Sequence, residues 1–420
     1  MKNLLIVKLS SLGDVIHTLP AAQALRQAYP EAHLAWAVDR AHAAVLHDQP
    51  WLNEVIEHDR RSLRTYSQFI RRLRRTNWDA AIDFQGLFRS SVTTWLSGAP
   101  RRVGYSPGRE WSHWFYNDRA ASATLEQHAV DRYYQLASHL GGWLDGMPLV
   151  RPYLTGDPPR PWHNGPRLFP LPVGDADRLA AAQWLAGYGC LSERQRLVVL
   201  HAHARRSANL WPASQFAQLA RLLHSRGNVQ VVVTGGPQAK SICDEVAARS
   251  GVDVWRADGQ LSLMASVELI RRAAVMVTCD SGPMHLAASV GTPIVALFGA
   301  TNPLRTGPYC TNAIAIDRCL PCGHCKGKTC PRKLDPPQCM VEIGVEEVFA
   351  AVQRQLSLHC KPLHDSPFSE HPQQNSLPFQ EFHTNTPPFQ GGAGGGSLSS
   401  PHFPSPEKSA AARVIERPFA

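Results

Sequence analysis

The chain has 420 residues, of which 44% are hydrophobic and 18% charged, and its formal net charge is +9. This length exceeds what one hydrophobic core usually supports, so two domains are expected. No apolar run approaches the roughly 18 to 20 residues of a membrane-spanning helix. The amino-terminal apolar run is only LLIV before Lys8, and no small-residue cleavage site follows it, which indicates a first β-strand and a cytoplasmic location rather than a signal peptide.

Positive charge is concentrated between residues 60 and 75, which read RRSLRTYSQFIRRLRR. If this segment is helical, Arg64, Arg71 and Arg75 lie on one face. A basic amphipathic helix suits an anionic membrane surface or a phosphorylated lipid, and a solvated helix face is the alternative. The sequence contains no recognised nucleic-acid-binding motif, so nucleic acid is not an expected partner.

Strand-like and helix-like segments alternate in the first part of the chain. The strand-like runs LLIVKL, HLAWAV and AAIDF are interleaved with helical stretches such as AAQALRQAYP, a pattern that indicates βαβ units and a parallel sheet. A proline-rich stretch between residues 145 and 172 follows, and its composition predicts an interdomain linker. The first domain is therefore expected over residues 1–160.

The alternation resumes with RLVVLHA, WPASQFAQLARLLHSRG, VQVVVTGG, AVMVTC and TPIVALFG, which predicts a second Rossmann-like domain over residues 173–355. Two such domains that face each other leave a central cleft, and ligands of open α/β sheets bind at the carboxyl ends of the strands. Residues 361–420 are rich in Pro, Ser, Gln and His and lack an apolar period, so this tail is expected to be disordered.

The stretch VTCDSGPMHLAASVG, residues 277–291, runs from a strand through a turn into a helix that should begin near Pro283. The first N–H groups of a helix lack intrahelical partners and carry the positive end of its dipole, so a diphosphate would fit there. Gly282 would let the ligand approach the backbone, Asp280 or Ser281 would cap the helix or hold a ribose hydroxyl, and His285 would donate to a phosphate oxygen. A capped strand-to-helix turn without a ligand is the alternative.

A second polar turn, SSLGDVIHTLPA, follows the first strand and contains Ser10, Ser11, Gly13 and Asp14. Asp14 either caps the next helix or acts as a general base across the cleft from the anion site. A base and an anion site that face each other suit group transfer from a nucleotide-activated donor. No G-x-G-x-x-G follows the first strand, which argues against a dehydrogenase.

Three blocks carry a family resemblance: KLSSLGDVIHTLPA, AIDFQGLFRSS and DSGPMHLAASVGTPIVALFGATNP. Together with their spacing, they resemble the lipopolysaccharide heptosyltransferases, glycosyltransferase family 9, and the first block looks closer to heptosyltransferase I than to II. The resemblance implies an α/β protein with the GT-B fold, in which two Rossmann-like domains face each other across a cleft. It also implies inverting transfer, without a metal ion, from ADP-heptose to Kdo of a lipid A precursor at the cytoplasmic face of the inner membrane.

The resemblance also implies roles for individual residues. Asp14 is the expected general base, which takes the proton of the acceptor hydroxyl. The expected donor contacts are Ser10, Gly13, Asp280, Ser281, Gly282 and His285. Arg206 is a further candidate donor contact, which comes from this chain's own sequence and not from the resemblance. The expected acceptor contacts are Asp83, Gln85 and Arg89. Arg89 would pair with a Kdo carboxylate, and a surface arginine without a partner is the alternative.

One position departs from the family pattern. Relatives carry a Lys before the W-P of a loop in the second domain, whereas this chain reads HAHARRSANLWP, with Asn209 at about that place. Arg205 or Arg206 would replace the charge from a shifted loop, or both are solvated. Because of this departure, two alternatives stay open: a family member with another nucleotide sugar or acceptor, and a non-catalytic nucleotide-sugar-binding protein.

Cysteines gather near the carboxyl end of the second domain. Of the ten cysteines, six lie between Cys310 and Cys339. The dense part of this group, with His324 among it, consists of Cys319, Cys322, Cys325, Cys330 and Cys339. C-x₂-C spacing allows a structural zinc site, and reduced thiols or a redox-active pair are the alternatives. No catalytic metal and no cofactor other than the nucleotide-sugar substrate is expected.

Two further groups carry open alternatives. The aromatic residues Trp111, Trp114, Phe115 and Tyr116 would stack on a sugar, touch lipid or pack within the protein. His128 and Arg132 match a helix that lies near the cleft in relatives, and otherwise they form a surface pair.

Overall fold

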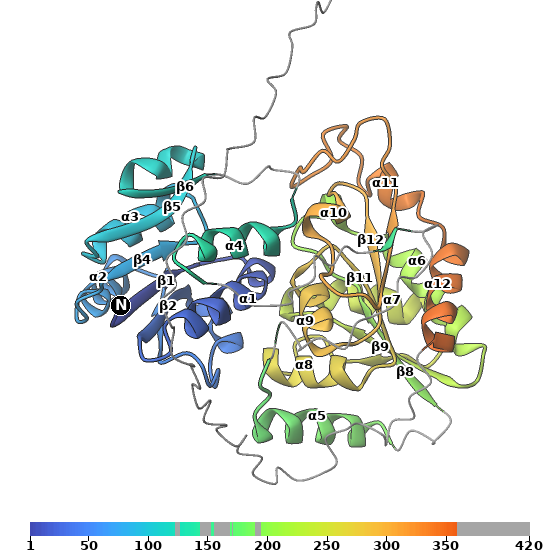
Figure 1. Ribbon diagram of the computed structural model, residues 1–420. Helices are drawn as coiled ribbons and strands as arrows, with labels where there is room; N and C mark the ends of the chain where they lie inside the picture. Colours follow the sequence, from blue (N-terminus) through green and yellow to red (C-terminus); the bar gives the residue numbers. More distant parts are fainter. Residues whose placement is uncertain (122–126, 143–152, 155–168, 170, 190–194, 359–420) are drawn as a thin grey trace, which may run out of the picture. The chain divides into compact units, whose positions relative to one another are not determined.

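The computed structural model describes residues 1–121, 127–142, 153–154, 169, 171–189 and 195–358 (Figure 1). The predicted tail over residues 361–420 and most of the predicted linker lie outside the described residues, as do Cys190 and Cys360. In the part of the chain that the structure describes, no helix has the length and apolar character that a membrane crossing requires.

The first sheet has six strands in the order β3-β2-β1-β4-β5-β6, and all its neighbouring strands are parallel. Its strands are β1 (Asn3–Val7), β2 (His33–Asp39), β3 (Glu54–His58), β4 (Ala80–Asp83), β5 (Arg101–Ser106) and β6 (Asp118–Ala121). The helices of this part are α1 (Leu12–Ala28), α2 (Leu63–Leu73), α3 (Phe88–Leu96) and α4 (Ala129–Ser138), with the short 3₁₀ helices η1 (Arg40–Val45) and η2 (Arg109–Phe115). The predicted βαβ pattern is confirmed.

The second sheet has seven strands in the order β10-β9-β8-β11-β12-β13-β7, again all parallel. Its strands are β7 (Tyr153–Leu154), β8 (Arg196–His201), β9 (Val229–Thr234), β10 (Trp255–Arg256), β11 (Val275–Cys279), β12 (Ile294–Phe298) and β13 (Ala313–Asp317). The α-helices are α5 (Asp175–Gly187), α6 (Ala213–His224), α7 (Lys240–Ser250), α8 (Leu263–Arg272), α9 (Gly282–Val290), α10 (Pro303–Thr306), α11 (Gln338–Val341) and α12 (Val345–Leu358), with the 3₁₀ helices η3 (Ser207–Asn209) and η4 (Pro237–Ala239). β7 lies within residues 1–160 of the chain but pairs with β13 of this sheet.

Helices cover both faces of each sheet (Figure 1). Leu4 and Ile6 of β1 belong to one hydrophobic core with α1 and α4, whereas Leu5 and Val7 belong to another with Phe69 of α2. In the second sheet, the side chains of β8 point alternately to the two faces. One set packs in a core with α6, α7 and α12, and the other packs in a core with α8 and α9. A parallel strand that is buried on both faces reads as a continuous apolar run, which is why these strands were recognisable in the sequence.

The carboxyl ends of the strands carry the two turns that the sequence singled out. β1 ends at Val7, shortly before α1 begins at Leu12, and β11 ends at Cys279, shortly before α9 begins at Gly282. The predicted start of a helix near Pro283 is confirmed, with Ser281 as its N-cap residue. The two turns therefore lie where ligands of open α/β sheets bind.

Candidate active site

The turn after β1 holds the Asp14 carboxylate in place. Ser11 is the N-cap residue of α1, and Asp14 Oδ2 accepts hydrogen bonds from Ser11 N at 3.2 Å and from Ser11 Oγ at 2.9 Å. The predicted capping role of Asp14 is therefore confirmed. The Asp14 side chain nevertheless keeps 40% of its surface exposed, so capping leaves the carboxylate accessible to a substrate.

The other carboxylate oxygen of Asp14 faces a buried cation. Asp14 Oδ1 accepts a hydrogen bond of 2.8 Å from the Tyr133 hydroxyl of α4 and lies 3.9 Å from Lys8 Nζ. Burial by itself would raise the pKa of Asp14, but the Lys8 charge and the hydrogen bonds from Tyr133 and Ser11 together outweigh burial and hold this pKa at about 2. Asp14 is therefore ionised at neutral pH.

The amino terminus of α9 contacts the start of α1. A methyl group added to Gly282 would lie 3.0 Å from Leu12 Cδ2, so the absence of a side chain at Gly282 allows the two helices to approach. Ser281 Oγ is 3.2 Å from Thr278 Oγ1, and within the described residues no side chain caps α9. The helix end thus keeps the positive dipole that the sequence predicted.

Asp280 precedes this helix end and has an unusual environment. Burial raises the pKa of Asp280 and the Asp14 charge acts in the same direction, whereas the nearby Thr301 hydroxyl and the Arg206 charge lower it; together these effects place the pKa at about 6. Asn209 Nδ2 lies 3.3 Å from the Asp280 carbonyl oxygen and 3.4 Å from its Oδ2. Asn209 therefore points at Asp280 from the position where relatives are expected to carry Lys, and Arg206 supplies the nearby positive charge.

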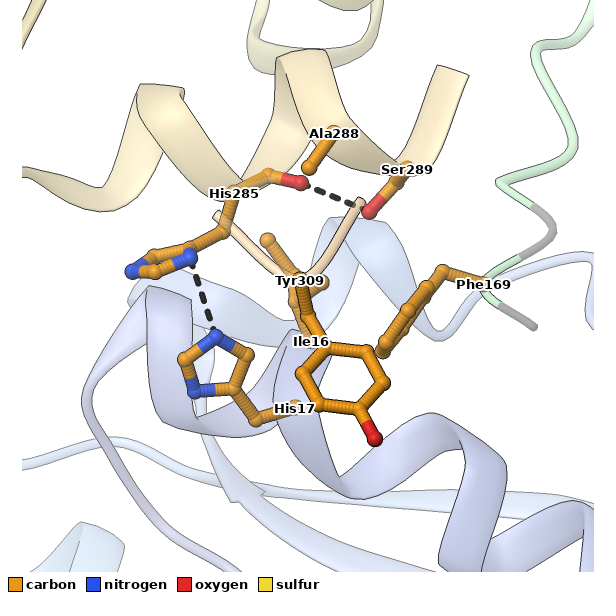
Figure 2. A pocket seen from close by; sticks show the side chains of 7 residues that line it. All are labelled: Ile16, His17, Phe169, His285, Ala288, Ser289 and Tyr309. Carbon is orange, nitrogen blue, oxygen red and sulfur yellow. Dashed lines mark hydrogen bonds between the residues drawn. The ribbon is translucent and has the colours of Figure 1, made fainter. Parts of the chain in front are cut away.

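His285 lies inside the contact between α1 and α9 (Figure 2). Its Nδ1 is 2.9 Å from Nε2 of His17 of α1, and a methyl group added to Gly13 would lie only 2.4 Å from His285 Cδ2. Burial lowers the pKa of His285 to about 4 and the pKa of His17 well below its usual range. Both imidazoles are therefore neutral at pH 7, so a phosphate contact of His285 would involve an uncharged ring.

His128 and Tyr309 form a second contact beside this histidine pair. His128 is the N-cap residue of α4, is only 5% exposed, and its Nε2 lies 3.0 Å from the carbonyl oxygen of Gly307. The Tyr309 hydroxyl donates to Asp131 Oδ1 at 2.7 Å. The alternative that placed His128 in a surface pair is wrong, because the ring is buried against residues of the second sheet's loops.

Two of the predicted acceptor residues organise backbone turns. Asp83 is fully buried, and its carboxylate accepts from the Tyr116 hydroxyl at 2.7 Å and from Gln85 N at 2.8 Å. Gln85 Oε1 accepts from the backbone N–H groups of Leu9 and Ser10 at 2.9 and 3.1 Å. In this structure the described contacts of both side chains are with the protein itself, and they hold the turn that carries Asp14. Their predicted contact with an acceptor stays a prediction.

Arg89 lines a hollow between α2 and α3. Its guanidinium donates to Asp39 at 3.1 to 3.2 Å and to Ser10 Oγ at 3.2 Å, so the alternative of a surface arginine without a partner is wrong. Arg60 also pairs with Asp39, at 3.5 Å. The hollow has a volume of about 520 Å³ and is lined by His58, Arg60, Ser62, Leu63, Tyr66, Phe88, Arg89 and Val92. Two guanidinium groups at an apolar hollow suit a carboxylate or phosphate on an otherwise apolar molecule.

The cysteine-rich segment adjoins the donor side of the site. The carbonyl oxygen of Lys328 in this segment accepts a hydrogen bond of 3.3 Å from Ala208 N. Lys326 N donates a hydrogen bond of 2.8 Å to the carbonyl oxygen of Ala300. Within the residues that the structure describes, no group of three or more His, Cys, Asp or Glu side chains is arranged to hold a metal ion. The structural zinc site therefore stays a prediction, and the described contacts give the segment a bracing role.

Three important side chains were not found from the sequence. Lys8 directly follows the apolar strand β1, and a charged residue at that place is the one signal that could have drawn attention to it. Tyr133 and His17 lie on helices without any local signal. Their roles come from contacts between residues 119 and 268 positions apart in the chain.

A family model described as glycosyltransferase family 9 (heptosyltransferase) matches residues 66–334. The chain belongs to glycosyltransferase family 9. It is therefore a glycosyltransferase, as predicted, and this favours the enzyme over the non-catalytic alternative.

Curated relatives and solved structures agree with this assignment. The chain is 29% identical to lipopolysaccharide heptosyltransferase 1 of Pseudomonas aeruginosa, over 84% of this chain and 97% of the relative. It is also 29% identical to lipopolysaccharide heptosyltransferase 1 of Escherichia coli K12, over 73% and 91%. Among solved structures, a glycosyl transferase family 9 protein of Veillonella parvula matches with a TM-score of 0.69 and 22% identity, over 85% of this chain and 98% of that chain. The E. coli ADP-heptose heptosyltransferase II matches with a TM-score of 0.66 and 23% identity, over 85% and 99%. The predicted GT-B fold is confirmed.

Proposed function

We propose that this member of the family transfers heptose from ADP-heptose to Kdo of a lipid A precursor, with inversion at the anomeric carbon. The observation that carries the proposal is the Asp14 carboxylate, which is ionised, accessible and placed on the helix that contacts the amino terminus of α9. Relatives named lipopolysaccharide heptosyltransferase 1 support this donor and acceptor, as does the matching structure titled E. coli heptosyltransferase WaaC with ADP-2-deoxy-2-fluoro heptose.

The proposed reaction uses the negative charge of the Asp14 carboxylate and the positive end of the α9 dipole. Asp14 takes the proton from an acceptor hydroxyl while that oxygen bonds to the anomeric carbon, and the bond from this carbon to ADP breaks on the opposite face. The electron pair of that bond leaves with the diphosphate. The N–H groups and dipole of α9, together with Arg206, stabilise the departing negative charge. Ser281 and Gly282 lie at this helix end, which supports their proposed role as donor contacts.

The acceptor enters through the hollow between α2 and α3. Arg89 and Arg60 already share the Asp39 carboxylate there, and an acceptor carboxylate would compete for the same guanidinium groups. Ser10 Oγ touches Arg89 at 3.2 Å and so joins this hollow to the turn that carries Asp14. The Kdo carboxylate and the reacting hydroxyl are thereby held by adjacent groups.

A donor panel tests the proposed function. The purified full-length chain is incubated with Kdo-lipid A and a series of ADP- and UDP-sugars, and the products are read by mass spectrometry. A heptose-sized mass increment that needs ADP-heptose is the expected result. Transfer only from a different sugar nucleotide would instead establish the alternative of another donor, which the Asn209 position favours.

The donor side should respond to pH through Asp280. Its raised pKa means that it is protonated below about pH 6 and ionised above, and an ionised Asp280 repels a diphosphate. We expect ADP affinity to fall as the pH rises through about 6. Asn209→Lys should bring a cation to Asp280, lower its pKa, and strengthen ADP binding several-fold at pH 8. Calorimetric titrations with ADP from pH 5 to 8 check this, with Asn209→Gln as the neutral control; equal pH profiles for all three proteins would contradict it.

We also propose that the chain acts as a peripheral protein on the cytoplasmic face of an anionic inner membrane. Arg64, Arg71 and Arg75 are all exposed, and they lie on or directly beside α2. Trp111 and Trp114 of η2 contact each other edge to face yet are 66% and 67% exposed, whereas Tyr116 is buried. Aromatic and basic side chains together suit the headgroup region of a bilayer.

Charge reversal on α2 tests the membrane contact. Each arginine near an anionic surface contributes about 1 kcal/mol, so Arg71→Glu with Arg75→Glu should weaken binding to vesicles containing phosphatidylglycerol by at least about tenfold. Arg178→Glu with Arg332→Glu changes the net charge equally at other exposed sites and serves as the control. Co-sedimentation in which both double variants bind equally would favour the solvated-face alternative.

A further inference from the structure

We propose that Lys8 and Tyr133 are positioning residues, which fix the Asp14 carboxylate so that one lone pair of Oδ1 remains to receive the acceptor proton. The inference rests on the proposed function, because it concerns the base of that reaction. Lys8 is 2% exposed at the end of β1, Tyr133 is 5% exposed in α4, and neither side chain was expected at the site from the sequence.

The chemistry of the three groups sets the direction of their hydrogen bonds. A lysine ammonium only donates, and Lys8 Nζ donates to the Tyr133 hydroxyl at 2.7 Å and to the Phe84 carbonyl oxygen at 3.2 Å. The Tyr133 oxygen therefore accepts from Lys8, and its own proton is donated to Asp14 Oδ1 at 2.8 Å. A hydroxyl that accepts from a cation is a stronger donor, so the contact with Asp14 is reinforced.

Counting donors identifies the reactive oxygen. An ionised carboxylate offers about four lone-pair positions. Both positions of Oδ2 are used by Ser11, through its N–H and its hydroxyl, whereas Oδ1 has the Tyr133 hydroxyl alone at hydrogen-bond distance among the described residues. The remaining lone pair is on Oδ1, and the side chain is 40% exposed. The acceptor hydroxyl should therefore meet Oδ1.

Lys8 also acts on Asp14 through its charge. The groups whose charge or polarity acts on this pair come from several elements: Tyr133, Ser11, Asp280, His285 and His42 around Asp14, and Asp83, Arg132, Arg109 and His17 around Lys8. A bound diphosphate adds negative charge to this set and raises the pKa of Asp14. Burial lowers the pKa of Lys8, whereas the Asp14 and Asp83 charges raise it and so favour the ammonium form. This ammonium group, 3.9 Å from Oδ1, opposes the rise in the Asp14 pKa when the donor is bound.

Tyr133→Phe separates positioning from simple packing, because it removes one hydroxyl and keeps the ring. We expect kcat to fall about 10- to 100-fold, because the rate of transfer depends steeply on the position of the base. The KM for the donor should change little. The acid limb of the kcat/KM profile should move to higher pH, because a hydrogen bond that lowers the Asp14 pKa is gone. Tyr105→Phe is the matched control: its hydroxyl donates to the Arg132 carbonyl oxygen at 3.0 Å, and no hydrogen bond joins it to Asp14 within the described residues.

Lys8→Met is the second variant and should move the acid limb in the same direction. If Lys8→Met does not fold, the Tyr133→Phe profile decides by itself. An acid limb and kcat that match Tyr105→Phe would overturn the proposal. Asp14→Asn is measured beside these variants: if it turns over like the wild type, the base assignment itself fails, whereas an inactive Asp14→Asn with an unaffected Tyr133→Phe removes only the positioning role.

Discussion

Asp14→Asn should lower the rate of glycosyl transfer by about 10²- to 10⁴-fold, the usual contribution of a general base. The substitution keeps the size of the side chain and removes its capacity to hold the proton of the acceptor. Single-turnover measurements with saturating donor and acceptor report the chemical step directly. ADP binding should persist, because Asp14 itself is not among the expected donor contacts.

The capping role of Asp14 requires a control for folding. Its Oδ2 holds the first turn of α1, and loss of a helix cap typically costs about 1 kcal/mol of stability. Ser11→Ala removes the hydrogen bond from the Ser11 hydroxyl to Asp14 Oδ2 and keeps the Asp14 carboxylate, so it reports the effect of a weakened cap while a base is still present. If Asp14→Asn and Ser11→Ala lost activity equally, capping would account for the whole effect and Asp14 would not be the base.

Gly13→Ala should produce the second large effect, because no room exists for a side chain at that position. The added methyl group would lie 2.4 Å from His285 Cδ2 and 2.9 Å from its Nε2, and contacts under 3 Å force the neighbour to move. His285 is buried and paired with His17, so it cannot turn aside without breaking the contact of α1 with α9. We expect a loss of about 1–3 kcal/mol in the free energy of unfolding, as is typical of overpacking, and at least a tenfold loss of turnover.

A second-site substitution tests the cause of this effect. His285→Ala removes the ring that the new methyl group would strike, so Gly13→Ala with His285→Ala should be more stable than additivity of the two single changes predicts. Gly187→Ala is the control, because a methyl group added there meets nothing within 4 Å. Denaturant titrations of the wild type, the two single variants and the double variant give the interaction energy between the two sites. Strict additivity would show that the Gly13 effect arises elsewhere.

The strands that hold the site were predictable because of their burial. β1, β2, β4, β8, β9, β11 and β12 are parallel strands covered on both faces, and such strands are apolar along their whole length. Shorter or more polar strands, such as β5 (Arg101–Ser106) and β10 (Trp255–Arg256), carry no continuous apolar run, and they were not predicted. Their pairing depends on the neighbouring strand rather than on their own sequence.

The turns of the candidate site were also readable locally. Each helix start is marked by residues that lie within four positions of each other in the chain: Ser11 with Asp14, and Ser281 with Pro283. Local chemistry did not decide between a cap and a base for Asp14. The structure shows that the cap uses Oδ2, whereas Oδ1 accepts a hydrogen bond from Tyr133, so capping leaves room for the proposed role as a base.

The sequence by itself determined the two α/β halves, the strand ends that carry the site, and the family motifs around Asp14 and Asp280, because each depends on residues close together in the chain. The tertiary structure alone decided the environments of these residues. Tyr133 contacts Asp14, which is 119 positions away in the chain, and His285 contacts His17, which is 268 positions away. The Arg89 side chain donates to Asp39. Burial and charge at such contacts set the pKa of each group, and both depend on the packing of distant segments, which no local pattern encodes.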